Sequence, residues 1–154
     1  MTSQYEDVTL TTRMLFHVTG LGGLVAYLFT TFLLFSVGLY HLGWQLGVGL
    51  VLILCVAVPC KLIFFKHRPQ KMKYSNLLGK FDAAAFPSIH AMRAVMIGLI
   101  VGSATTNPLV WTGAGLFALV VSYSRIYLRK HSLNDVIGGV IFSFLLFLIV
   151  QRII

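Results

Sequence analysis

Two histidines and an aspartate have types and spacing that could carry nucleophilic and acid–base chemistry. His131 and Asp135 are four residues apart, one turn of a helix, so the carboxylate could accept a hydrogen bond from one imidazole nitrogen. That bond would fix the tautomer and leave the other nitrogen of His131 as a nucleophile. His90 supplies a second imidazole that could act as an acid. A purely structural His–Asp pair would show the same spacing.

Cationic side chains and a helix start could hold a phosphate beside these groups. Lys61 and Arg68 are seven residues apart, two helical turns, and so point the same way. Pro87 and Ser88 suit the first turn of a helix, whose free N–H groups and dipole favour an anion. Arg125 adds a further cation. Each segment alone also fits a simpler role, as a basic helix cap or an ordinary helix start.

Two other chemistries fit the sequence less well. No His or Cys pair has zinc-ligand spacing within one segment. The phosphate-binding pattern G-x-x-x-x-G-K-[ST] is absent. Cys55 and Cys60 lie in one apolar run as i and i+5, so we expect packing residues rather than a disulfide. Phosphoryl transfer supported by cationic side chains remains the best match.

The elements that must position these residues are membrane helices. The chain has 154 residues, of which 58% are hydrophobic and only 10% are charged, and its mean hydropathy is +0.89. A soluble domain of ordinary composition has about 25% charged residues. The soluble, disordered and fibrous classes are therefore excluded. In a membrane protein the net charge of +8 points to anionic headgroups, a phosphorylated substrate or a topology signal, and not to nucleic acid.

Five apolar stretches are long enough to cross a bilayer, which takes about 20 residues. They cover residues 14–39, 42–60, 88–105, 108–127 and 132–150. The sequence predicts an all-α integral membrane bundle of about five transmembrane helices, forming a single domain over residues 1–154. Residues 1–13 are expected to be an N-terminal tail, and the chemistry-bearing segments fall within residues 61–135. The lysine-rich connection 61–87 could contain an interfacial segment at residues 70–86 or a disordered basic loop.

Most ionisable residues converge on one membrane boundary. Five spans place the N-terminus, the long connection and the turn at residues 128–131 on one face, with only His41 and Arg152 on the other. The excess of basic residues would put the first face in the cytoplasm. The same charges could instead attract an anionic substrate, so the side of the membrane stays open.

In their order along the chain, the three segments resemble the signature of the type 2 phosphatidic acid phosphatase superfamily. That signature reads K-x6-RP, PSGH and SR-x5-H-x3-D. The chain matches it with Lys61 to Arg68-Pro69, with Pro87-Ser88-Ile89-His90, and with Ser124-Arg125, His131 and Asp135. The one departure is Ile89, where the family usually has glycine. The matched region covers about half of the chain.

The resemblance implies a role for each matched residue. His131 would attack phosphorus and form a phosphohistidine, Asp135 would orient His131, and His90 would protonate the leaving alkoxide and then activate water. The phosphate oxygens would be held by Lys61, Arg68, Ser88, the amide of Ile89, and Arg125. No metal or other cofactor is expected. An isoleucine keeps the amide but would be strained if the site required positive φ at that position.

The implied function is the metal-independent dephosphorylation of a membrane lipid in a multi-pass protein of the cell membrane. Candidate substrates are polyprenyl phosphates or diphosphates, phosphatidic acid and phosphatidylglycerol phosphate, and the sequence does not choose among them. The expected partners are this lipid phosphate and the bilayer, and the oligomeric state is left open. Two alternatives are a phosphotransferase with the same intermediate and a lipid-binding membrane protein with weak or no activity.

Overall fold

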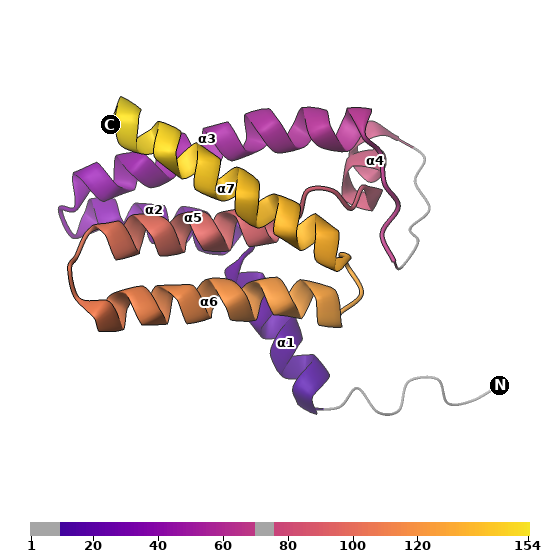
Figure 1. Ribbon diagram of the computed structural model, residues 1–154, viewed down its shortest axis with the longest axis horizontal. Helices are drawn as coiled ribbons and strands as arrows, with labels where there is room; N and C mark the ends of the chain where they lie inside the picture. Colours follow the sequence, from indigo (N-terminus) through magenta and orange to yellow (C-terminus); the bar gives the residue numbers. More distant parts are fainter. Residues whose placement is uncertain (1–9, 70–75) are drawn as a thin grey trace.

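The computed structural model describes residues 10–69 and 76–154, and these residues form a bundle of seven α-helices (Figure 1). Residues 1–9 and 70–75, including part of the predicted N-terminal tail and of the predicted interfacial loop, lie outside the described residues. The helices are α1 (Leu10–Leu21), α2 (Leu24–Ser36), α3 (Tyr40–Ile63), α4 (Leu77–Ala83), α5 (Ile89–Ser103), α6 (Pro108–Tyr127) and α7 (Leu133–Ile153).

The predicted all-α membrane bundle is confirmed, although not every apolar stretch is one straight span. In the described part of the chain, α3, α6 and α7 are long and apolar enough to cross a bilayer. The first stretch is broken into α1 and α2, which are bent by 48° and count as a fourth span only if taken together. The third predicted stretch, residues 88–105, forms α5, which has 15 residues and is shorter than predicted.

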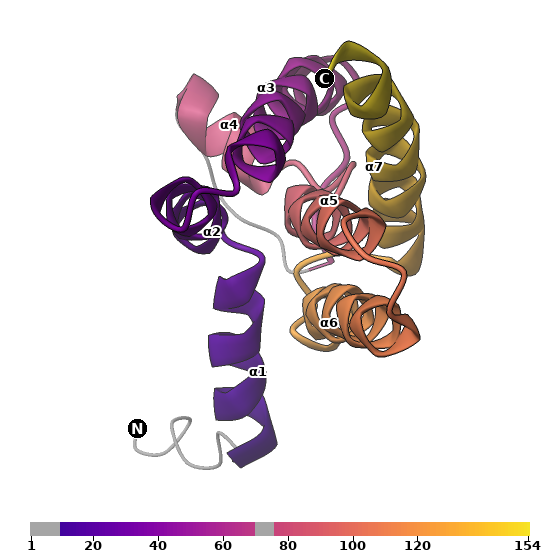
Figure 2. The same ribbon diagram turned by 90° about the vertical axis from the view of Figure 1, so that its left-hand side faces the viewer.

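Helix α5 is the centre of the bundle, with α3, α6 and α7 packed around it (Figure 2). Nine of its 15 residues are buried, including Met92, Met96 and Ile100. The exposed large side chains of α2, α6 and α7 are mostly Leu, Ile, Val and Phe, the side chains that a lipid-facing surface requires. The short central helix is therefore shielded by longer helices that face the hydrocarbon.

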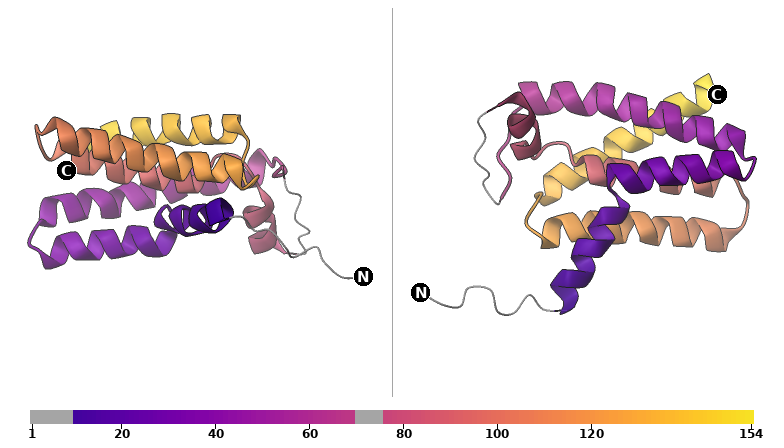
Figure 3. Two further views of the ribbon diagram at one scale, coloured as in Figure 1. Left: turned by 90° about the horizontal axis from the view of Figure 1, so that it is seen from below. Right: turned by 180° about the vertical axis from the view of Figure 1, so that it is seen from behind.

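The break between α1 and α2 lies at a close contact between the chain and the rest of the bundle. A Cβ added to Gly22 would lie 2.6 Å from a side-chain carbon of Val121 and 3.0 Å from the carbonyl oxygen of His90. Only glycine permits this approach without displacement of α5 or α6. Helix α1 then leaves the bundle obliquely beside the C-terminal half of α6 (Figure 3).

The long connection after α3 folds back onto itself instead of projecting from the bundle. The N–H of Ala85 donates to the carbonyl of Lys66 at 2.7 Å, and His67 forms an isolated bridge with Ala84. Between them, the side chain of Asn76 accepts the N–H of Gly79 at 2.7 Å and so caps α4. Part of the segment expected to be an interfacial or disordered loop is therefore the short helix α4.

Two glycines let α7 approach the segment that precedes α5. A Cβ on Gly139 would lie 2.8 Å from the carbonyl oxygen of Ser88, and one on Gly138 would collide with the ring of Phe86. Contacts below 3.0 Å force a shift, and a backbone oxygen cannot rotate out of the way. The start of α5 is thus held against the first turns of α7.

We expect Gly139→Ala to lower the thermal midpoint of the detergent-solubilised protein by about 3–10 °C. The added methyl group pushes Ser88 and α7 apart, whereas Gly115→Ala on α6 meets no atom within 4 Å. The measurement is thermal unfolding of both variants beside the wild-type protein. Equal midpoints for the two variants would show that the close approach at Ser88 does not contribute to stability.

Candidate active site

The three sequence segments meet at one end of the bundle around a cavity of about 160 Å³. The end of α3 brings Lys61, the start of α5 brings His90, and the turn between α6 and α7 brings His131. The cavity is also lined by Arg68, Phe81, Ile89 and Arg93. Ser88 is fully buried at the N-terminus of α5, and Arg125 acts electrostatically on both histidines. Most of the predicted site residues therefore lie together at one end of the bundle.

His131 is oriented by a backbone carbonyl. Its Nδ1 lies 2.7 Å from the carbonyl oxygen of Ala85, and the side chain is only 3% exposed. A carbonyl oxygen can only accept, so Nδ1 carries the proton and Nε2 keeps its lone pair. The main-chain N–H of His131 donates to the carbonyl of Arg125 at 3.1 Å, which holds the turn. The imidazole is therefore fixed in the tautomer that a nucleophilic Nε2 requires.

The predicted bond between His131 and Asp135 is not among the hydrogen bonds of the described residues. The prediction assumed that both residues lie on one helix, but α7 begins at Leu133 and Ser132 is its N-cap. His131 therefore lies in the preceding turn, where the i, i+4 geometry of a helix does not apply. The hydrogen-bond partner of His131 is therefore different from the one predicted, whereas its tautomer is the same.

The carboxylate of Asp135 is fully buried and holds the residue that follows His131. Its Oδ2 accepts both the N–H and the hydroxyl of Ser132 at 2.7 Å, forming the capping box of α7. Its Oδ1 pairs with the Nζ of Lys66 at 2.6 Å. The backbone carbonyl of Asp135 accepts the N–H of Ser88 at 3.0 Å. Asp135 thus ties together the turn before α7, the long connection and the start of α5.

Two cationic residues of the site, Lys61 in the cavity lining and Arg125 beside it, are buried. Lys61 is 3% exposed, donates from Nζ to the carbonyl of Ala84 at 2.6 Å, and lies 5.2 Å from the ring centroid of Phe81. Arg125 is 6% exposed and donates from Nη1 to the hydroxyl of Thr19 at 2.8 Å. Keeping several like charges out of water is costly unless an anion joins them. The arrangement therefore favours a phosphate group in the cavity.

The N-terminus of α5 offers further donors. The ladder of α5 begins with the N–H of Met92 bonded to the carbonyl of Ser88, so the amides of residues 89–91 precede it. The buried Oγ of Ser88 has no hydrogen-bond partner among the described residues. Arg129 is the one non-glycine residue with positive φ in the described ranges, so Ile89 is not strained by its backbone. Isoleucine is therefore compatible with this site.

Burial and the nearby cations together determine the protonation of His131. Burial first, and then Arg125, Arg68 and Lys61, lower the pKa of His131 to about 3, although its bond to Ala85 acts in the opposite direction. An imidazole in an unfolded chain has a pKa of about 6.5. The folded protein therefore binds fewer protons than the unfolded chain between these values, and this group adds stability as the pH rises through that window. At neutral pH the imidazole of His131 is therefore uncharged.

We expect the imidazole of His131 to stay neutral, with its proton on Nδ1, down to about pH 5 in phosphate-free protein. The measurement is a pH titration of the ring carbon and nitrogen resonances of labelled protein in detergent, assigned by their loss in His131→Asn. A titration midpoint near the ordinary value of about 6.5 would show that neither burial nor the cations act on this ring.

Four neighbours of the site were not among the predicted site residues. Lys66 lies inside the first segment, but its separation from Asp135 in the sequence follows no pattern from which their contact could be predicted. Thr19 bonds to Arg125 across 106 positions of sequence. Phe81 lies on α4, in a connection whose fold the sequence left open. Arg93 was visible as a charge in an apolar stretch, which is itself a signal of function.

Comparison with known proteins agrees with this geometry. The sequence profile of the PAP2 superfamily matches residues 42–154. The fold is similar to the crystal structure of Aquifex aeolicus LpxE, with a TM-score of 0.80 and 19% identity over 96% of this chain and 88% of that one. No curated protein matches the sequence.

A second similar structure is the first transmembrane PAP2-type phosphatidylglycerolphosphate phosphatase from Bacillus subtilis. Its TM-score is 0.70 at 21% identity, covering 96% of this chain and 78% of that one. At these identities the two structures establish the shared fold, and the profile match over most of the chain establishes the family. The chain therefore belongs to the PAP2 superfamily, and it is a membrane phosphatase of that superfamily.

Proposed function

We propose that this protein dephosphorylates a membrane lipid phosphate through a phosphohistidine on His131, without a metal ion. The observation that carries the proposal is the hydrogen bond from Nδ1 of His131 to Ala85, in a cavity lined by Lys61 and Arg68. It leaves Nε2 with a lone pair beside the charges that a phosphoryl group requires.

The reaction has two steps. In the first, Nε2 of His131 forms a bond to phosphorus while the P–O bond to the lipid breaks, and His90 gives its proton to the leaving oxygen. In the second, His90 takes a proton from water as the water oxygen attacks phosphorus. The N–P bond then breaks, inorganic phosphate leaves, and His131 is again neutral. Lys61, Arg68, Arg125, the hydroxyl of Ser88 and the amide of Ile89 hold the phosphate oxygens.

Asp135 acts in this scheme through the backbone. It fixes Ser132 and thereby the turn that carries His131, and Lys66 neutralises its charge. The orienting role implied by the family motif is thus retained, but by a path other than a direct carboxylate–imidazole bond. We therefore assign Asp135 as a positioning residue.

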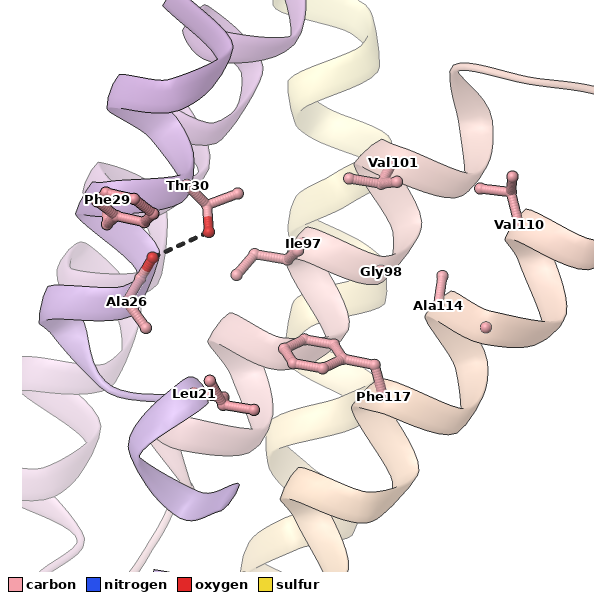
Figure 4. A pocket seen from close by; sticks show the side chains of 11 residues that line it. Leu21, Ala26, Phe29, Thr30, Ile97, Gly98, Val101, Val110, Ala114 and Phe117 are labelled. Atoms are coloured by element: carbon pink, nitrogen blue, oxygen red, sulfur yellow. Dashed lines mark hydrogen bonds between the residues drawn. The ribbon is translucent and has the colours of Figure 1, made fainter. Parts of the chain in front are cut away.

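A lipid substrate is supported by an apolar cleft of about 450 Å³ between α2, α5 and α6 (Figure 4). Phe29, Ile97 and Phe117 line it, and its lining contains no titratable side chain. Ile97 follows His90 by seven residues on α5, two helical turns or about 10 Å along the axis. An amphiphile with its phosphate at His90 could therefore extend an apolar chain toward this cleft.

The test is phosphate release by purified protein in detergent, with and without EDTA. The panel includes prenyl phosphates and diphosphates, phosphatidic acid and phosphatidylglycerol phosphate, the last because the similar Bacillus subtilis protein carries that name. We expect EDTA-resistant release in the wild-type protein. Release that requires a lipid acceptor would identify a phosphotransferase, and binding without release would identify a lipid-binding protein.

A further inference from the structure

Arg93 lies in the catalytic cavity but has no task in the reaction described above. It lines the cavity together with His90 and His131, and it is only 7% exposed. Its Nε is buried without a hydrogen-bond partner among the described residues. Among the side chains that the structure describes, no carboxylate forms an ion pair with Arg93. Arg93 also lies outside the three motifs.

A guanidinium does not lose its proton under physiological conditions, so Arg93 is a permanent buried charge. Tyr27 acts on it electrostatically, but the hydroxyl of Tyr27 already donates to the carbonyl of Leu46 at 2.9 Å. A buried cation without an anionic partner is strongly unfavourable in a membrane helix. The ligand is therefore expected to bring an anionic group to this position.

The position of Arg93 indicates which part of the substrate it meets. His90 is the second residue of α5, and Arg93 follows it by three residues, about 4.5 Å further along the helix axis into the bundle. The transferred phosphoryl group must lie next to His131, and His90 marks the leaving oxygen. Arg93 consequently lies on the leaving-group side, between the scissile bond and the lipid chain.

The charge of the leaving group decides whether a cation there is useful. A lipid monophosphate releases an alcohol, which is neutral once His90 has protonated it. A lipid diphosphate releases a lipid monophosphate, which remains anionic throughout the reaction. Only the second kind of leaving group gains stabilisation from a guanidinium.

We propose that Arg93 binds the second phosphate of a lipid diphosphate, and that this protein prefers diphosphates to monophosphates. The inference rests on the proposed function of the same site. Nε2 of His131 bonds to the terminal phosphorus, the bridging P–O bond breaks, and the bridging oxygen leaves with the lipid-bound phosphate. Water then releases inorganic phosphate from His131, and Arg93 holds the lipid monophosphate until it departs.

The kinetic test compares farnesyl diphosphate with farnesyl phosphate in wild type, Arg93→Gln, Arg93→Lys and Arg152→Gln. We expect Arg93→Gln to lower the ratio of kcat/KM values, diphosphate over monophosphate, by about 10- to 100-fold. Arg93→Lys should restore part of the ratio because it keeps the charge. Arg152→Gln removes an exposed arginine from the last turn of α7, at the other end of the bundle, and should not change the ratio.

A binding test separates this proposal from the catalytic one. Calorimetry on a His131→Ala protein would measure the affinity of a farnesyl methylene-bisphosphonate and of farnesyl phosphonate. This measurement does not require turnover. We expect the additional Arg93→Gln change to weaken the bisphosphonate far more than the phosphonate. Equal weakening of both ligands, or of neither, overturns the proposal even if the protein is an active phosphatase.

The same assay with phosphatidylglycerol phosphate distinguishes two kinds of lipid that carry a second phosphate, a lipid diphosphate and a phosphate monoester that also contains a phosphodiester. Its second phosphate is a diester separated from the scissile bond by the glycerol carbons. A loss on Arg93→Gln that is confined to this lipid would mean that Arg93 meets a diester, and it would overturn the assignment to a diphosphate.

Discussion

Replacing His131 with alanine is expected to remove phosphate release from every lipid, lowering kcat by at least about 10³-fold. No other imidazole in the cavity combines a donated Nδ1–H with a position in the turn before α7. His90 lies on α5 and cannot take over an attack from the opposite side of phosphorus. Phosphate release and acid-labile labelling of the protein by a phosphorylated substrate would both be measured.

The matched control is His17→Ala, which removes an exposed histidine of α1 and should leave both readouts unchanged. Thermal unfolding would verify that the His131→Ala protein is folded. Release that persists at the wild-type rate in a folded His131→Ala protein would exclude the phosphohistidine mechanism. It would leave the family membership intact, because membership rests on the match over residues 42–154.

The second large effect is expected from His90→Ala, and its size should depend on the leaving group. A lipid alkoxide needs a proton from His90, so kcat on lipid monophosphates should fall by about 10²- to 10⁴-fold. Nitrophenolate leaves without protonation, so the first step with p-nitrophenyl phosphate should survive. Because His90 also activates water, the second step should then be slow and the phosphohistidine should accumulate.

The measurement is a pre-steady-state burst of nitrophenolate, with an amplitude near one per active site, followed by slow turnover. The accumulated intermediate should appear as phosphoprotein that is stable in base and labile in acid. A variant that loses the burst and the steady state together would show that His90 contributes to binding or folding rather than to proton transfer.

How far the sequence could predict the site depends on the range of each interaction. The position of Lys61, His90 and Arg125 at one boundary follows from helix lengths, because apolar stretches of known span place their ends on alternate faces. The cavity therefore lies where the motifs indicated. These are properties of single segments and of their order along the chain.

The partners of the site residues were beyond such reasoning. The prediction of a His131–Asp135 bond was wrong because Ser132 caps α7. The helix starts at Leu133, two residues after His131, so His131 does not share a helix face with Asp135. The hydrogen bond from His131 to Ala85 joins two loops that are 46 residues apart in the sequence. Loops have no helical or strand periodicity from which such a contact could be predicted. The bend between α1 and α2 depends on the contact of Gly22 with Val121, which hydropathy alone cannot reveal.

The hydrogen bond between Thr19 and Arg125 has a consequence for what counts as the minimal functional unit. The region recognised by the family profile begins at residue 42, yet the hydroxyl that holds Arg125 comes from α1, upstream of it. A chain shortened to residues 42–154 would keep every motif residue and lose this support, along with the packing of Gly22 against α6. The region matched by the family profile therefore does not contain every residue that supports the candidate site.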